Sequence, residues 1–248
     1  MDSIDFASMP GAVLPEEQTS AVELPTGELA EKQAPSDDKP FFREKELVAN
    51  ELAIIISGEW SPEQLDVKLI HLDFVVRAGL VGRYQEQPYL LDPHLEDLIR
   101  PAMDKLSELM QTLDEAMEKG PDVPLPAKPA EQARGLLRFL YILCTVRGYK
   151  TIVKFFSHHV SDLEPAFRFL NAQDRSKASQ WTGRYMLLLW LSLLCMVPFD
   201  LKIVDSQALG DETSGFVDRM IIAIIPYLGS ASKEREAAAY LLAKLVTR

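Results

Sequence analysis

Apolar residues recur along this chain at the spacing of helices, and the densest group spans Tyr185–Val197. Within it only Ser192 is polar, Arg184 precedes it, and Pro198 follows it. The group lacks strand-like alternation and is shorter than the about 20 apolar residues that a membrane span needs. A helix that is apolar on all sides must pack against other helices on several faces. We therefore expect an inner helix of a stacked-helix protein over 181–197.

Other segments carry apolar residues three and four positions apart, as one face of a helix does. The helices predicted from this spacing cover 41–56, 65–76, 92–117, 131–146, 149–156, 163–170, 217–228 and 233–246. Capping boxes at Ser61–Gln64 and Ser161–Glu164 predict two helix starts. Gly58 and Gly148 predict helix ends, and Pro101 predicts a kink or break near Arg100.

Sustained period-2 alternation is absent, so the chain is predicted to be all-α. The helices come in consecutive pairs whose length is that of HEAT or armadillo repeats, roughly 40–47 residues. The last helix, 233–246, carries more apolar residues than one preceding helix can cover. The predicted fold is therefore a HEAT/armadillo-like helical solenoid fragment.

The organisation of the chain follows from composition. Residues 1–40 hold five prolines and many acids, with Lys32 and Lys39 as the bases. Such a segment buries too little apolar surface to offset its ordering entropy, and we expect a disordered acidic tail. Residues 41–248 form the predicted helical repeat region, with a Pro-rich linker at about 120–130 (G-P-D-V-P-L-P-A-K-P). The first residues, M-D-S-I-D-F, lack the pattern of a signal peptide.

Charge and cysteine content exclude some classes of protein. The net charge of −11 argues against nucleic-acid binding, which needs clustered Lys and Arg. Cys144 and Cys195 lie in apolar helical runs, where small buried hydrophobes are expected. No apolar stretch reaches spanning length, so no membrane span is predicted.

Residue patterns that carry chemistry are missing. The four histidines are His71, His94, His158 and His159, and no His/Cys set has the spacing of zinc ligands. The chain has neither a nucleophile elbow nor a glycine-rich phosphate loop. We therefore predict no catalytic, cofactor or metal site and favour a binding scaffold over an enzyme.

Two polar segments are candidates for contact with a partner. Arg147, Tyr149 and Lys150 surround the turn that ends an apolar helix. Arg147 and Lys150 would interact favourably with the dipole at the C-terminus of that helix, or they would contact an acidic partner. Gln85 and Glu86 lie in a loop with aromatic edges, which either presents them at a surface or is pinned to the core by its leucines.

Arg184 offers two similar alternatives. It would cap a neighbouring helix, or it would pair with a buried carboxylate that fixes the stacking of helices.

Three segments of the chain also resemble sequences of a known protein family. They are Y-Q-E-Q-P-Y-L-L-D-P-H-L-E (84–96), R-F-L-Y-I-L-C-T-V-R-G-Y-K (138–150) and R-Y-M-L-L-L-W-L-S (184–192) followed by P-F-D (198–200). In this order they resemble the N-terminal region of the tubulin-folding cofactor D family, over roughly 41–248. Members of that family are far longer than 248 residues, so the resemblance implies an N-terminal piece or a truncated product.

The resemblance implies a non-catalytic chaperone that captures β-tubulin. With tubulin-folding cofactors E and C it would assemble or take apart the αβ-tubulin heterodimer and stimulate GTP hydrolysis by tubulin. It also implies an Arf-like small GTPase as partner, and a cytoplasmic location with association to microtubules. The residue pattern alone supports only a stacked-helix binding scaffold. A generic HEAT or armadillo adaptor that binds another protein is therefore the alternative.

Overall fold

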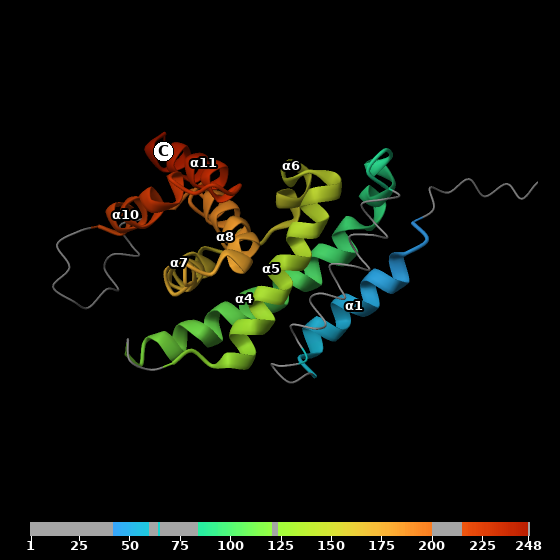
Figure 1. Cartoon of the computed structure of the whole chain (residues 1–248), viewed down its shortest axis with the longest axis horizontal. Helices are drawn as coiled ribbons and strands as arrows, with labels where there is room; N and C mark the ends of the chain where they lie inside the picture. The colour runs from blue at the N-terminus through green and yellow to red at the C-terminus, as the bar shows by residue number, and fades with distance from the viewer. Residues whose placement is uncertain (1–41, 60–63, 65–83, 121–123, 200–214, 248) are drawn as a thin grey trace, which may run out of the picture. The chain divides into compact units, whose positions relative to one another are not determined.

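The computed structural model describes residues 42–59, 64, 84–120, 124–199 and 215–247. All of them belong to the unit Pro40–Arg248. The described residues form helices joined by turns and contain no strand, which confirms the all-α prediction (Figure 1). The predicted tail at 1–40 and the helix predicted over 65–76 lie outside the described residues, as does its capping box apart from Gln64.

The first helix, α1, spans Lys45–Ser57 and ends where Gly58 adopts a left-handed φ of 64°. Its buried face carries Val48, Leu52 and Ile55. The last carbonyls of a helix lack partners within it. Here the Gln132 side chain, which lies on helix α5 (Ala127–Arg147), donates to the carbonyls of Ile55 and Ile56 at 2.9 and 2.8 Å. A side chain from another helix thus supplies hydrogen-bond donors to the last carbonyl groups of α1.

A 3₁₀ helix, η2 (Pro88–His94), leads into the long helix α4 (Leu95–Met117). The predicted apolar stripe is confirmed, because its members through Leu113 are buried and Met117 is partly buried. Pro101 lies inside α4 without ending it, so the alternative of a break there is wrong. Pro101 is exposed, so the carbonyl that loses its amide partner lies on the side of the helix that water can reach.

Helix α5 spans Ala127–Arg147 and begins four residues before the predicted 131. Pro129 is the third residue of α5, where a backbone N–H would have no partner within the helix, so proline does not prevent an earlier start. Helix α6 (Tyr149–Ile152) and the 3₁₀ helix η3 (Val153–Phe155) follow, over the short helical piece predicted at 149–156.

The second capping box is wrong. A 3₁₀ turn, η4 (Val160–Asp162), precedes helix α7 (Leu163–Asn171), whose N-cap residue is Asp162 rather than Ser161. No side-chain capping bond forms there. Instead the buried Asp162 carboxylate accepts from the hydroxyls of Ser107 and Ser157 at 2.9 and 2.7 Å. These longer-range donors hold the carboxylate away from the helix start.

Helix α8 (Trp181–Leu194), which follows the 3₁₀ turn η5 (Ala178–Gln180), is the inner helix that the sequence predicts. Residues 184–192 are all buried, and Trp190 has no exposed surface. Helices α5, α7 and α11 (Glu234–Val246) pack around it. Contact on several sides explains why this helix carries no polar face.

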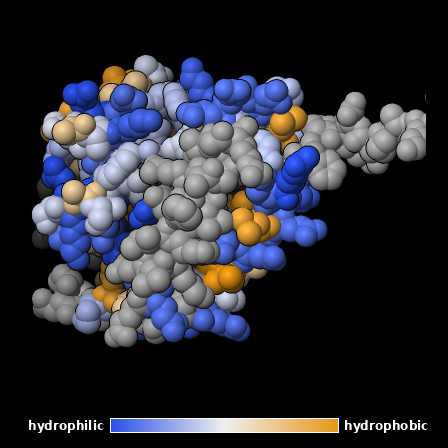
Figure 2. Space-filling view, turned by 45° about the vertical axis from the view of Figure 1, so that its right-hand side comes forward, coloured by the Kyte–Doolittle hydropathy of each residue, from blue (hydrophilic) through white to orange (hydrophobic). Residues whose placement is uncertain are grey.

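Helices α10 (Phe216–Leu228) and α11 complete the described chain, with Pro226 in the last turn of α10 as predicted. Both α8 and α10 pack against α11, so its buried face is covered by two helices rather than one. Elsewhere α4 and α5 lie side by side and run in opposite directions (Figure 1). Where Figure 2 colours the surface by hydropathy, most of it is hydrophilic, with small separate hydrophobic groups.

Candidate protein-interaction site

The predicted contact segment at the end of α5 is a sharp turn, the α5–α6 turn (residues 147–150). Gly148 adopts φ 90° and ψ 137°, a combination that side chains with a Cβ rarely adopt. Its N–H donates to the carbonyl of Cys144 at 3.0 Å, and its carbonyl accepts from Thr151 at 3.2 Å. The chain therefore reverses within one residue and places residues 147 and 149–150 on successive helices.

Arg147 is tied to the loop that contains the other predicted segment. Its guanidinium donates to both carboxylate oxygens of Asp92, at 2.5 and 2.8 Å. The hydrogen bond from Arg147 lowers the pKa of Asp92, against the opposing effect of desolvation. The side chains are 27% and 41% exposed. The sequence suggested the helix dipole or a partner for Arg147, and the structure adds an internal carboxylate that neutralises it.

Tyr149 and Lys150 have different surroundings. Tyr149 is partly buried, and its ring meets that of Tyr240 on α11 edge to face, with centroids 6.4 Å apart. The ammonium of Lys244 lies 5.4 Å from the centroid of Tyr240. Lys150 is exposed and takes part in no described ion pair. Tyr149 therefore joins two helices, whereas Lys150 is available to a partner.

Gln85 and Glu86 are exposed beside the buried Tyr84. The hydroxyl of Tyr84 donates to the carboxylate of Glu44 and accepts from the backbone N–H of Arg43. Farther along the loop, Leu91 is only 1% exposed, while Leu90 is partly buried. The apolar residues of this loop thus pin it to the core, as one alternative held, and Gln85 and Glu86 are exposed; their contact with a partner stays a prediction.

The predicted site residues do not form one cluster. The pair Asp92–Arg147 joins the two segments, but no described hydrogen bond or ion pair links Gln85 or Glu86 to the α5–α6 turn. Asp92 was missing from the predicted site because its pairing depends on how η2 packs against the end of α5.

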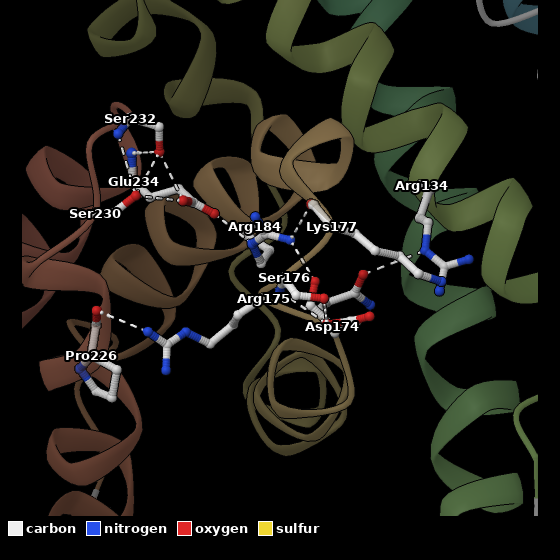
Figure 3. A network of polar contacts seen from close by, with 11 residues as sticks. Arg134, Asp174, Arg175, Ser176, Lys177, Arg184, Pro226, Ser230, Ser232 and Glu234 are labelled. Atoms are coloured by element: carbon white, nitrogen blue, oxygen red, sulfur yellow. Dashed lines mark hydrogen bonds and ion pairs between the residues drawn. The ribbon is translucent and has the colours of Figure 1, made fainter.

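The network around Arg184 answers the question that the sequence left open (Figure 3). Its Nε donates to Glu234 of α11 at 2.5 Å, and its Nη1 donates to the carbonyls of Asp174 and Lys177 at 3.0 and 3.2 Å. The hydroxyls of Ser230 and Ser232 donate to the other oxygen of Glu234.

Both charged side chains of this network are buried, at 3% and 5% exposure. Arg184 therefore both pairs with a buried carboxylate and caps a turn. It fixes α8 against α11 and has no surface to offer a partner.

Other chemistry-bearing residues are placed as follows. Among the described residues, no group of three or more His, Cys, Asp or Glu side chains is arranged to hold a metal ion. Cys144 and Cys195 are buried, and burial raises the pKa of the Cys144 thiol well above its usual range. None of the described helices combines the length and apolar character that crossing a bilayer requires.

Comparisons with known proteins show which family this chain is similar to. The model of the family "Tubulin-specific chaperone D-like, ARM repeat" matches residues 81–248, which include the α5–α6 turn and the Arg184 network. The tubulin-folding cofactor D of Schizosaccharomyces pombe is 30% identical over 125 residues, which cover 50% of this chain and 10% of that protein.

The tubulin-specific chaperone D of Dictyostelium discoideum is 24% identical over a match that covers 68% of this chain and 17% of that protein. The chain thus spans less than a fifth of the length of these relatives. No solved structure matches it. The family match covers more than half of the chain and names the helical repeat that the stacked helices form. The chain belongs to the tubulin-specific chaperone D-like family of ARM-repeat proteins.

Proposed function

We propose that this protein works as a tubulin-folding chaperone that captures β-tubulin. With tubulin-folding cofactors E and C it would assemble or take apart the αβ-tubulin heterodimer and stimulate GTP hydrolysis by tubulin. It would do so in the cytoplasm and at microtubules, without an active site of its own, and an Arf-like small GTPase would be a further partner. The observation that carries the proposal is the family match over residues 81–248.

The structure suggests where contact with such a partner would lie. Lys150 is exposed at the α5–α6 turn, next to a backbone that Gly148, the Asp92–Arg147 pair and Tyr149 hold in place. A cation on a backbone that is held in place suits recognition of an acidic surface, because the backbone itself needs little further ordering on binding.

Retention of purified tubulin by the immobilised chain tests the proposal. The wild-type chain is expected to retain β-tubulin, and Lys150→Glu is expected to weaken retention several-fold. Lys128→Glu is the matched control, because Lys128 is exposed at the opposite end of α5. A folded wild-type chain that retains no tubulin would overturn the proposal and favour an adaptor for another protein.

A further inference from the structure

The longest stretch without an acid in this acidic chain is residues 132–161. The whole sequence has 37 Asp and Glu against 26 Lys and Arg, yet residues 132–161 contain five Lys or Arg, two His and no Asp or Glu. The C-terminal part of this stretch runs from the α5–α6 turn through η3 to His159. Lys and Arg thus follow one another along this piece of backbone without an intervening acid, although Arg134 and Arg147 pair with Glu131 and Asp92 from outside it.

The last residues of the stretch form one wall of a cleft of about 620 Å³. That wall is the segment Lys154–His159, and the opposite wall is one face of α4, from Glu96 and Arg100 to Met103 and Asp104. The spacing of these four α4 residues places them on the same side of the helix. The volume falls within the roughly 300–1,000 Å³ of ordinary ligand sites.

The segment wall is held rigidly from behind. The indole Nε1 of the buried Trp190 donates to the carbonyl of Ser157 at 3.0 Å. The Ser157 hydroxyl donates to Asp162 at 2.7 Å and accepts from the backbone N–H of His159 at 3.2 Å. Asp162 is tied to α4 in turn by the Ser107 hydroxyl. A wall fixed in this way loses little conformational entropy when a ligand binds.

The two walls differ in charge. On α4, Arg100 is paired with Glu96, and Asp104 adds a second acid. On the segment wall, Lys154, His158 and His159 are exposed.

Apolar side chains belong to both walls. Met103 on α4 and Phe156 on the segment wall are almost fully buried, and Phe155 is partly buried.

We propose that this cleft binds an acidic linear segment of a protein partner. Acidic side chains of that segment would face Lys154 and the two histidines, and one apolar side chain between them would lie against Phe155. Charge complementarity carries the choice, because the segment wall offers Lys154 and two histidines without an acid, and because Arg100 pairs with Glu96 on α4, which leaves Asp104 as the lining acid without a described ion pair. The identity of the partner as tubulin rests on the proposed function, whereas the chemistry of the ligand does not.

Fluorescence anisotropy with labelled peptides tests the cleft directly. The probes are Glu-Glu-Phe-Glu-Glu, the same peptide with Gln for every Glu, and the same peptide with Ala for Phe. The intact chain should bind the first peptide most tightly. Lys154→Glu should weaken that binding roughly tenfold, equivalent to about 1.4 kcal/mol. The double variant His158→Ala/His159→Ala should weaken it less.

Lys128→Glu serves again as the matched control, and circular dichroism confirms that each variant is folded. Equal binding of the Glu and Gln peptides, or unchanged binding by folded Lys154→Glu, would overturn the proposal. The two proposals fail separately: tubulin retention by the wild-type chain together with equal binding of the Glu and Gln peptides would refute the cleft alone. Peptide binding that follows the expected order without any tubulin retention would refute the proposed function alone.

Discussion

Removing the charge of Arg184 tests how α8 is joined to α11. Arg184→Met takes away three donated hydrogen bonds, one to Glu234 and two to backbone carbonyls. Breaking a buried ion pair by deleting one partner costs about 3–5 kcal/mol. Asp174 and Lys177, whose carbonyls lose a donor, lie in an exposed turn that water can reach, and two serine hydroxyls still solvate Glu234. We therefore expect the lower end, about 3 kcal/mol.

Urea unfolding followed by far-ultraviolet circular dichroism measures this cost. With an m-value of about 2 kcal/mol/M, a loss of 3 kcal/mol lowers the midpoint by about 1.5 M. Such a loss is a large part of the roughly 5–15 kcal/mol that stabilises an ordinary domain.

The double variant Arg184→Met/Glu234→Gln separates the ion pair from simple packing. Its neutral amide still accepts from the serine hydroxyls but leaves no uncompensated buried charge. It should therefore be more stable than Arg184→Met alone, by more than about 1 kcal/mol. Destabilisation equal to the sum of the two single variants, or a loss below about 1 kcal/mol for Arg184→Met, would refute the reasoning.

Three further predictions concern the Asp92–Arg147 pair and two glycines with positive φ. Arg147 lowers the pKa of Asp92, so the pair stabilises the fold above the ordinary carboxyl pKa and loses this effect as pH falls through the folded value. Because the pair is partly exposed, Asp92→Asn should cost at most about 1 kcal/mol at pH 7 in urea unfolding, and a difference that persists at low pH would contradict this. Gly148→Ala should cost up to about 3 kcal/mol from backbone strain, although no atom lies within 4 Å of the added Cβ. Gly58→Ala should cost about 1–2 kcal/mol, because its φ of 64° is left-handed and a Cβ would lie 3.2 Å from Gln132; the reverse order in the same assay would contradict the strain argument.

Local pattern predicted much of the described fold. The stripe from Leu95 to Leu113 is buried as its spacing indicated, and α8 is surrounded as its lack of a polar face indicated. The predicted ends of the helices were less accurate. Helix α5 begins at Ala127 rather than 131, because proline in a first turn does not prevent a helix. Ser161 matched a capping box, but Asp162 begins α7.

The candidate site was predicted only in part, for a reason that these residues share. Exposure of Lys150, Gln85 and Glu86 agrees with their polar context. The role of Arg147 depends on Asp92, which is 55 positions away in the chain. Nothing near Arg147 in the sequence indicates which carboxylate will face it.

The sequence by itself determined the helical class, the inner position of α8 and the family, because each depends on periodicity or on runs of neighbouring residues. Only the tertiary structure decided which charges meet. Arg184 donates to Glu234, which lies 50 positions away in the chain. The Asp162 carboxylate accepts from Ser107, 55 positions away, instead of capping its own helix. Hydrophobic burial is non-directional and can be predicted from spacing, whereas a buried hydrogen bond needs a partner within about 3 Å in a fixed direction. The packed helices alone bring such partners together.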